Sequence, residues 1–364
     1  MTLKVAIVGC GKIADGHVEE IQKMPDLAYV VGVCDLEPLM AEQLAMRYRI
    51  GAFASDLDQL LDEQRPDVVH ITTPPGSHAA IAKRALDAGC HVFVEKPLTP
   101  TLAATKDLLE YAARSGRKLT IGYTYLFDPP AQDLRKLLAQ GALGDVVHVE
   151  SFYGYNLRGP YGSAILADPE HWVVKLPGQL LHNNLDHLLN KLLEFFEDDA
   201  PSVVARGLVR RSERFGDARD SMFDELRLVV TGKETTAYGT FSSFARPAGH
   251  FLRVYGTKNT AHVDFVSRTV TLEGASSSLP SAIGRLVPAF EMAARFARSG
   301  LTNALRFARS DFHFFSGLNY LFRRFYESIR DGTPPPISQR DIVRVATLLD
   351  SIFLQLGEAK EVAR

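Results

Sequence analysis

The ten residues VAIVGCGKIA at positions 5–14 place an apolar, strand-like run directly before the pattern Gly-x-Gly-x-x-Ala. In a turn from a strand into a helix, Gly9 permits the tight turn, Gly11 lets the backbone approach a pyrophosphate, and Ala14 allows close helix packing. The N–H groups and dipole of the following helix favour phosphate charge. The alternative is that the glycines serve only the turn. We expect cofactor contacts from four residues of this loop: Gly9, Gly11, Lys12 and Ile13.

The surrounding pattern supports a nucleotide-binding turn. Between residues 3 and 123, strand-like and helix-like segments alternate, as in a parallel sheet covered by helices on both faces. The predicted strands lie at 3–8, 28–34, 68–72, 91–95 and 118–122. The predicted helices lie at 13–24, 37–48, 77–88 and 102–115. This α/β layout predicts a doubly wound, Rossmann-type parallel sheet.

Asp35 ends the second predicted strand, 21 residues after Ala14. A carboxylate at that place can accept hydrogen bonds from the adenosine ribose hydroxyls and would repel a 2′-phosphate. The interpretation favours NAD over NADP. The alternative is that Asp35 only caps the helix expected near Glu37.

The segment TTPPGSH, residues 72–78, follows the third apolar strand at the edge where open sheets bind ligands. Ser77 is expected to be a helix N-cap. A turn and cap without further role is the alternative. Four residues are expected to neighbour the cofactor: Thr72, Thr73, Pro74 and His78.

Glu95-Lys96-Pro97 comes directly after the fourth apolar strand, on the same edge. Partial desolvation and a nearby nicotinamide cation would both penalise the charged form of an amine at Lys96. Such an amine could take a hydroxyl proton as hydride leaves the carbon. We therefore predict Lys96 as a catalytic residue, and both Glu95 and Lys96 as cofactor neighbours. An exposed surface lysine is the alternative.

These three motifs, in this order, resemble the GFO/IDH/MocA oxidoreductase family over essentially the whole chain. The resemblance implies a Rossmann domain over 1–123 and an α+β domain over 124–364, whose open, mostly antiparallel sheet carries the substrate pocket and commonly mediates oligomerisation. It also implies that Lys96 is catalytic or substrate-binding and that the peptide bond before Pro97 is cis.

The segment GQLLHNNLDHLLNK, residues 178–191, has a helical pattern that places Asn183, His187 and Asn190 on one face. By resemblance, His187 matches the family's histidine, while the two asparagines stand where many members carry aspartates. We expect His187 to be catalytic and Asn183 to bind substrate; a histidine satisfied inside a helix interface is the alternative. His182 and His187 are five apart and point to different faces, so no metal site is predicted.

Two tyrosines are further candidates for substrate contact. Tyr123 lies directly before the second domain, and Tyr155 follows the first predicted strand of that domain, where an ordinary loop residue is equally plausible. Leu126 stands where relatives often have an arginine. The substrate of a better-known family member therefore cannot be assumed to be the substrate of this chain.

The second domain is expected to contain a helix at 127–139, a set of short strands and a helical segment at about 279–330. The strands are predicted at 146–153, 203–210, 225–231, 236–244, 251–255 and 269–272. The 279–330 segment mixes arginines with phenylalanines and leucines. Packing or oligomer contacts are favoured for it over a membrane or anionic-ligand role. A capping box formed by Ser338 and Asp341 predicts a last helix ending near residue 356.

Composition narrows the function classes. Lys+Arg 41 against Asp+Glu 43 gives a formal charge of -2, which provides no field to attract nucleic acid. Three dispersed cysteines fit a reducing compartment, and no signal peptide or spanning stretch is recognised, so a cytoplasmic protein is expected.

The leading hypothesis is an NAD-dependent oxidoreductase that transfers hydride between nicotinamide and a secondary alcohol or ketone of a sugar, cyclitol or nucleotide sugar. One alternative keeps NAD tightly bound for a net non-redox reaction, such as isomerisation, sugar–sugar oxidoreduction or glycoside cleavage. Another is a non-catalytic NAD-dependent regulator. A homodimer or homotetramer is expected, with a small sugar-like substrate as the partner molecule.

Overall fold

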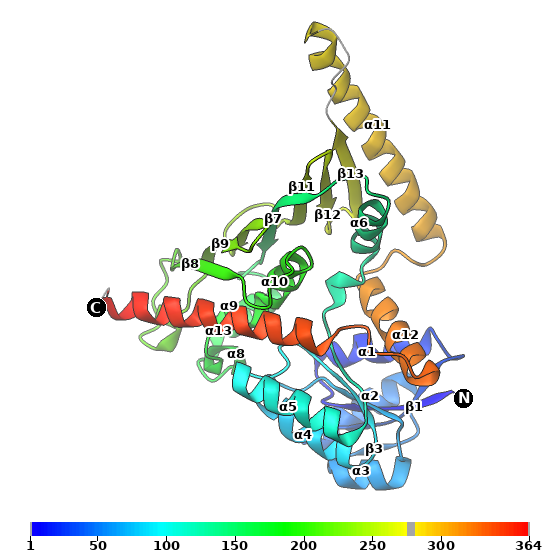
Figure 1. Cartoon of the computed structure of the whole chain (residues 1–364). Helices are drawn as coiled ribbons and strands as arrows, with labels where there is room; N and C mark the ends of the chain where they lie inside the picture. The colour runs from blue at the N-terminus through cyan, green and yellow to red at the C-terminus, as the bar shows by residue number, and fades with distance from the viewer. Residues whose placement is uncertain (1, 275–280, 363–364) are drawn as a thin grey trace. The chain divides into compact units, whose positions relative to one another are not determined.

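The computed structural model describes residues 2–274 and 281–362. The chain divides into two compact units (Figure 1). Unit 1 contains Met1–Thr124 and Gly317–Thr347, and unit 2 contains Tyr125–Ser316 and Leu348–Arg364. The predicted second domain comprises all of 124–364. The chain thus returns to unit 1 after most of unit 2 has been built.

Unit 1 is organised around a six-stranded parallel sheet of order β3-β2-β1-β4-β5-β6. Its strands are β1 (Leu3–Val8), β2 (Ala28–Cys34), β3 (Phe53–Ala54), β4 (Val68–Ile71), β5 (His91–Val94) and β6 (Leu119–Ile121). The central strands are almost wholly apolar and buried, as expected when both faces of a sheet are covered. The strand order reverses between β1 and β4, and open α/β sheets bind ligands outside the carboxyl ends at such a point.

Five helices connect these strands, and a sixth reaches unit 1 from late in the chain. They are α1 (Lys12–Gln22), α2 (Pro38–Tyr48), α3 (Leu57–Gln64), α4 (Pro75–Asp87), α5 (Leu102–Ser115) and α12 (Ser316–Asp331). The predicted doubly wound sheet is confirmed. Strand β3 and the helix α3 that follows it were not predicted; β3 has only two residues and therefore no strand pattern in the sequence. The expected N-cap at Ser77 is wrong. Helix α4 begins at Pro75, whose missing N–H is not needed in the first turn.

Helix α12 packs an aromatic face into unit 1. Phe322, Phe325 and Tyr326 are fully buried. The ring centroids of Phe322 and Phe93 lie 4.9 Å apart in an edge-to-face contact. The packing role expected for this part of the arginine-rich segment is therefore confirmed. Burial of these rings accounts for the grouping of α12 with the first unit.

Unit 2 is built on a seven-stranded sheet of order β13-β12-β11-β7-β10-β9-β8. Its strands are β7 (Val146–Gly154), β8 (Ser202–Leu208), β9 (Glu225–Thr231), β10 (Thr236–Ser242), β11 (His250–Gly256), β12 (Asn259–Asp264) and β13 (Thr269–Gly274). All neighbouring strands are antiparallel except the pair β7 and β10. The open, mostly antiparallel sheet is confirmed, although β12 was not predicted.

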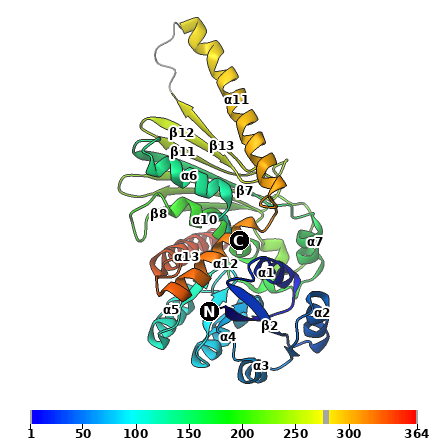
Figure 2. The same ribbon diagram turned by 90° about the vertical axis from the view of Figure 1, so that its right-hand side faces the viewer.

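The helices of unit 2 gather mainly beside this sheet. They are α6 (Pro129–Ala139), α7 (Pro160–Ala167), α8 (Trp172–Lys175), α9 (Gln179–Asn184), α10 (Asp186–Leu193), α11 (Ser281–Ala308) and the part of α13 (Gln339–Val362) after Thr347, with short 3-10 turns at Thr124–Leu126 and Ala218–Ser221. Helix α10 packs on β7 and β10, and α11 runs along β13 (Figure 2). The helix expected over 178–191 is divided at Leu185 into α9 and α10.

Other expectations for the end of the chain can be compared directly. The helical segment expected over about 279–330 is found as α11 and α12, while its first two positions lie outside the described residues. The N-cap at Ser338 is confirmed, since Asp341 N donates to Ser338 Oγ at 3.1 Å and α13 begins at Gln339; the Asp341 carboxylate accepts from the same hydroxyl at 2.6 Å.

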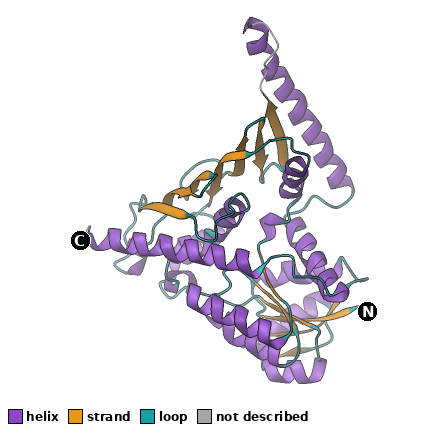
Figure 3. Ribbon diagram, viewed as in Figure 1, coloured by secondary structure: helices purple, strands orange, loops and turns teal. Residues whose placement is uncertain are grey.

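The two sheets differ in how far helices cover their faces (Figure 3). The strands of unit 1 have helices on both faces, whereas unit 2 leaves large side chains exposed on one face of its sheet. Val204, Val229 and Tyr238 lie in register on β8, β9 and β10 and are 67%, 44% and 53% exposed. Among the described residues, no helix combines the length and apolar character needed to cross a bilayer.

Candidate functional site

The turn after β1 is shaped by two glycines with different surroundings. Gly9 has φ +97°, and a Cβ there would lie 2.7 Å from Thr73 Cγ2, so only glycine fits. A Cβ on Gly11 would meet no described atom within 4 Å. The backbone at Gly11 is therefore open to a ligand, as a pyrophosphate-binding turn requires. Helix α1 starts at the next residue, Lys12, which is exposed, and Ile13 is half-buried.

Asp35 holds the two adjoining turns. Its Oδ2 accepts a hydrogen bond from Cys10 N at 2.6 Å, and its Oδ1 accepts one from Glu37 N at 3.0 Å. Helix α2 has Glu37 as its N-cap residue, so the carboxylate lies just before the helix. The structure therefore places Asp35 beside the glycine turn, with lone pairs left for further donors.

The TTPPGSH turn packs against the same glycine loop. Thr72 is buried, and its hydroxyl donates to the Gly9 carbonyl oxygen at 2.5 Å. Thr73 Oγ1 accepts a hydrogen bond from Ser77 Oγ at 2.7 Å. Pro74 is exposed and precedes α4. Of these residues, Thr73 and Pro74 are the accessible ones.

His78, which is also expected to neighbour the cofactor, contacts the backbone of two turns. It is fully buried, with Nε2 2.7 Å from the Thr73 carbonyl oxygen and Nδ1 3.1 Å from those of Pro97 and Leu98. Burial lowers the pKa of its imidazole, although the backbone carbonyls act in the opposite direction. His78 thus links the threonine turn to the segment that carries Lys96.

Glu95 and Lys96 follow β5 at the carboxyl edge of the unit 1 sheet. The peptide bond between Lys96 and Pro97 is cis, which confirms the expectation from the resemblance. Glu95 is buried, and its Oε2 accepts a hydrogen bond from Lys96 N at 3.2 Å. A Cβ on Gly122 would lie 2.9 Å from Glu95 Oε1, so this glycine leaves space for the carboxylate.

Behind Glu95 lies a line of three buried side chains from distant parts of unit 1. Glu95 Oε1 is 2.9 Å from His17 Nε2, His17 Nδ1 is 3.0 Å from His70 Nδ1, and Tyr326 Oη is 2.9 Å from His70 Nε2. The two histidines and Tyr326 are fully buried. We call Glu95, His17, His70 and Tyr326 the histidine chain.

The histidine chain has a defined direction when both imidazoles are neutral. Burial alone would raise the pKa of Glu95, but the hydrogen bond from His17 and the nearby Lys96 charge outweigh it and lower the pKa. The carboxylate only accepts, so His17 donates to it from Nε2, His70 donates to His17, and Tyr326 donates to His70. Burial holds the pKa of His70 well below its usual value, which keeps this imidazole neutral.

Unit 2 contains a second buried polar group, centred on Lys191 of α10. Lys191 is 1% exposed, and its Nζ lies 2.7 Å from His250 Nε2 on β11. The same Nζ is 5.3 Å from the ring centroid of Tyr125 and 5.2 Å from that of Phe265, which are cation–π distances. Burial lowers the pKa of Lys191 to about 7, although Asp128 and Glu194 act in the opposite direction.

His187 joins this group through aromatic contacts. Its ring centroid is 4.9 Å from that of Tyr125 and 5.3 Å from that of Tyr153. Tyr125 also contacts His250, with centroids 4.3 Å apart, and burial raises the pKa of Tyr125 to about 12. We call Lys191, His250, His187, Tyr125 and Tyr153 the lysine cluster.

The remaining candidates divide between the units. Tyr123 belongs to unit 1 and is 2% exposed, whereas Asn183 and Tyr155 belong to unit 2. Tyr155 Oη is buried without a hydrogen-bond partner among the described residues, and so are both amide atoms of Asn190. These groups are therefore available to a ligand.

Sequence reasoning missed most of both clusters. Lys191 lies four residues after His187 on a helix, and this spacing could have identified it as a neighbour of that histidine. No local signal connects His17, His70 and Tyr326, because they come from α1, β4 and α12. Within the described chain, no group of three or more His, Cys, Asp or Glu side chains is arranged to hold a metal ion.

Comparison with known proteins agrees with this geometry. Residues 3–123 match the oxidoreductase family with an NAD-binding Rossmann fold, and residues 131–262 match the GFO/IDH/MocA C-terminal domain. The chain belongs to the GFO/IDH/MocA oxidoreductase family. This confirms the family expected from the three motifs and the NAD-binding character of its first domain.

Two of the similar proteins are named as dehydrogenases of a glucoside and of inositol. The chain is 33% identical to D-glucoside 3-dehydrogenase of Escherichia coli over 40% of this chain and 41% of that protein. It is 32% identical to inositol 2-dehydrogenase of Salmonella typhimurium over 41% of this chain and 45% of that protein. These matches span less than half the length of either relative.

A solved structure extends the likeness to the whole fold. The WlbA dehydrogenase of Bordetella pertussis, in complex with NADH and UDP-GlcNAcA, has a TM-score of 0.72. The alignment covers 99% of this chain and 98% of that chain at 17% identity. At this identity the likeness concerns the fold.

Proposed function

We propose that this protein is an NAD-dependent oxidoreductase that transfers hydride between nicotinamide and a secondary alcohol or ketone of a sugar-like substrate. One observation carries the proposal. Within unit 1, the open glycine turn after β1 and the Glu95-Lys96 pair after β5 both lie at the carboxyl edge of one parallel sheet.

The residues present fit a dinucleotide. Gly11 leaves its backbone open, the start of α1 favours phosphate charge, and Asp35 offers a carboxylate to ribose hydroxyls. We propose NAD over NADP, because the same carboxylate would repel a 2′-phosphate. Bound NAD would supply the hydride acceptor.

Lys96 would move the proton. In the oxidising direction the substrate carbon loses a hydride, its hydroxyl loses a proton to the Lys96 amine, and a carbonyl double bond forms. Glu95 would hold the Lys96 backbone through its bond to Lys96 N, while the histidine chain fixes the Glu95 carboxylate from behind. In unit 2, His187, Asn183 and Tyr155 would bind substrate hydroxyls. Support for a sugar or cyclitol comes from the substrates named for the relatives.

The test is turnover by Lys96 variants of the full chain. With a panel of sugars and cyclitols, Lys96→Met is expected to reduce kcat by about 10²- to 10⁴-fold, the usual contribution of a general acid or base. NAD affinity, measured by fluorescence titration, should stay unchanged. Lys83→Met removes a lysine paired with Asp107 on the surface and serves as the control.

The outcomes separate the candidate functions. Full activity in Lys96→Met would contradict the proposal. Substrate conversion without net NADH would instead favour transient oxidation on a tightly bound cofactor. NAD binding with no conversion of any substrate would favour a regulatory protein.

We also propose that the open face of the unit 2 sheet pairs with a second copy of the chain. The aligned apolar residues Val204, Val229 and Tyr238 support this, because large exposed apolar patches mark interaction surfaces. Sedimentation of Val229→Glu against the unchanged chain tests it, and an unchanged mass would contradict the proposal.

A further inference from the structure

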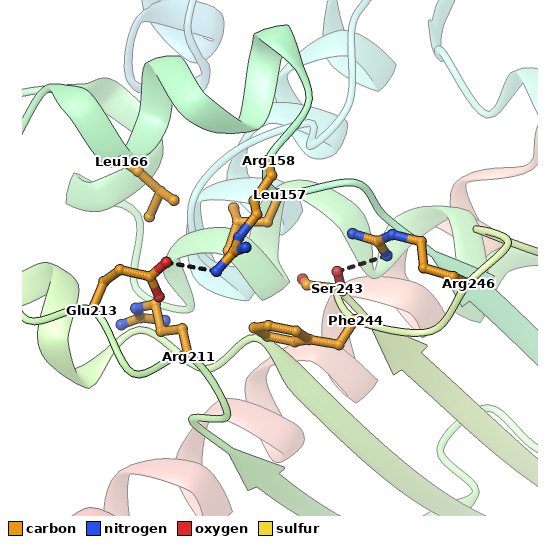
Figure 4. Close-up of a pocket in the computed structure, with 8 residues that line it drawn as sticks. All are labelled: Leu157, Arg158, Leu166, Arg211, Glu213, Ser243, Phe244 and Arg246. Atoms are coloured by element: carbon orange, nitrogen blue, oxygen red, sulfur yellow. Dashed lines mark hydrogen bonds and ion pairs between the residues drawn. The ribbon is translucent and has the colours of Figure 1, made fainter.

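A pocket of about 140 Å³ lies in unit 2 where the chain leaves β7, β8 and β10 (Figure 4). Its charged lining residues are three arginines and one glutamate: Arg158, Arg211, Arg246 and Glu213. All of them belong to one compact unit. The pocket therefore has an excess of positive charge.

The arginines differ in how far their charge is compensated. Arg158 Nη2 is 2.7 Å from Glu213 Oε1, and Arg211 Nη1 is 3.1 Å from the buried Asp224 Oδ2. Arg246 instead donates to neutral oxygens: Nη1 to the Ser243 carbonyl at 3.0 Å and Nη2 to Asn156 Oδ1 at 3.2 Å. Within the described residues, no carboxylate pairs with Arg246.

A buried hydroxyl supplies an independent second observation. Ser243 is 2% exposed, lines the pocket and lies between Arg158 and Arg246 (Figure 4). Its Oγ has no hydrogen-bond partner in the described chain. A buried hydroxyl without a partner is unfavourable, so a ligand oxygen that accepts from Ser243 would remove that cost.

The size and chemistry of the pocket select one class of ligand group. Pockets that hold entire small molecules usually measure about 300 to 1,000 Å³, so this one suits a single group of a larger ligand. A guanidinium cation combined with a hydroxyl donor suits an oxyanion, because Arg matches the geometry of phosphate and carboxylate oxygens.

We propose that this pocket binds a phosphate or carboxylate group carried by the substrate. Arg246 provides the main charge, Ser243 donates one hydrogen bond, and Arg158 turns from Glu213 towards the anion. The assignment deepens the proposed dehydrogenase function, on which it rests, by naming the substrate class as an anionic sugar.

Calorimetric titration of the full chain tests the assignment without any turnover. The probes are D-glucose 6-phosphate, D-glucuronate and neutral myo-inositol at low ionic strength. We expect at least one anionic probe to bind at least tenfold more tightly than myo-inositol. Tight binding of the phosphate would identify a phosphorylated or nucleotide sugar, and tight binding of the uronate a sugar acid.

Substitutions then locate the binding. Arg246→Met should lower the affinity for the anionic probe at least tenfold. Arg114→Met removes the same charge from exposed Arg114 on α5 and should leave the affinity unchanged. Ser243→Ala should weaken binding about three- to tenfold. Its thermal stability should not change, because Ser243 Oγ makes no bond that would be lost.

A gain in affinity provides the sharpest test. Glu213→Gln removes the one carboxylate that lines the pocket and releases Arg158, so anionic probes should bind several times more tightly. A misfolded variant cannot produce this result. Equal affinities for all three probes, or equal affinity in Arg246→Met and the unchanged chain, would overturn the assignment. Anion binding without sugar oxidation would contradict the dehydrogenase alone.

Discussion

The histidine chain of unit 1 and the lysine cluster of unit 2 are both buried, but they differ in how their ionisable groups are surrounded. In the histidine chain the Glu95 carboxylate lies at one end, and every histidine ring nitrogen has a hydrogen-bond partner. In the lysine cluster an amine lies among aromatic rings, and its pKa falls to about 7. The comparison suggests a fixed support beside Lys96 in unit 1 and a titratable group beside His187 in unit 2.

The largest expected effect is a pH dependence that belongs to Lys191. Its folded pKa of about 7 lies below the unfolded value of 10.5, so between these values the unfolded chain binds the additional proton. Stability should therefore rise with pH in that window, by about 1.4 kcal/mol per unit. Lys191→Met should remove this slope, so the difference in free energy of unfolding between the two proteins should change by about 3 kcal/mol from about pH 7 to about pH 9.5.

Urea unfolding of both proteins at several pH values measures this slope. Lys136→Met, which removes an exposed lysine of α6 in the same unit, is the control and should keep the slope. Parallel stability curves for Lys191→Met and the unchanged chain would contradict a titratable lysine cluster.

Glu95→Ala tests the charged end of the histidine chain. Removing a buried carboxylate leaves His17 Nε2 without its acceptor, and we expect the free energy of unfolding to fall by about 2 to 3 kcal/mol. Asp107→Ala, in an exposed pair with Lys83, should cost far less. A loss for Glu95→Ala no larger than that control would show that the chain is not a support.

Tyr326→Phe tests the neutral end. The variant keeps the buried ring and removes only the hydrogen bond to His70 Nε2, so the loss should be about 1 kcal/mol. Chemical denaturation measures the loss, with Tyr111→Phe on the exposed face of α5 as the matched control. If Tyr326→Phe equals Glu95→Ala in cost, the two ends are not distinct as we infer.

Asn190→Leu should have the smallest effect on the free energy of unfolding. It tests a buried polar group of unit 2 that, unlike the members of the histidine chain, has no hydrogen-bond partner in the described chain. Both amide atoms of buried Asn190 lack partners in the described chain, so leucine should leave stability within about 0.5 kcal/mol or increase it. Thermal unfolding measures this change. A loss above about 2 kcal/mol, typical of a broken buried hydrogen bond, would show that Asn190 is satisfied in solution.

The elements that could be predicted from sequence are those with a local pattern. The alternating segments of 3–123 predicted five of the six strands of unit 1, and the GxGxxA turn, Asp35 and Glu95-Lys96 lie at the expected strand ends. The omissions have local causes. Strand β3 has only two residues, and β12 follows a turn in a region where short strands have little periodicity of their own.

The candidate site was predicted only in part for the same reason. The contacts of His78, whose two ring nitrogens both meet backbone carbonyls, could not be predicted from its motif. Tyr155, Asn183 and His187 all belong to unit 2, as expected for residues of the second domain. Their roles in substrate binding and catalysis remain proposals. Arg246 and Ser243 carry no recognisable motif, and only the folded loops after β7, β8 and β10 bring them to one pocket with Arg158.

The sequence by itself determined the nucleotide-binding turn, the parallel sheet and the position of Lys96, because each depends on neighbours within a few residues. Tertiary structure decided which buried groups meet. The contacts that link His17, His70, Glu95 and Tyr326 span as many as 256 positions of the chain, and Lys191 meets His250 across 59. No local periodicity encodes such pairs; they form when apolar surfaces pack, and each buried polar atom must then find a partner at the place where packing leaves it.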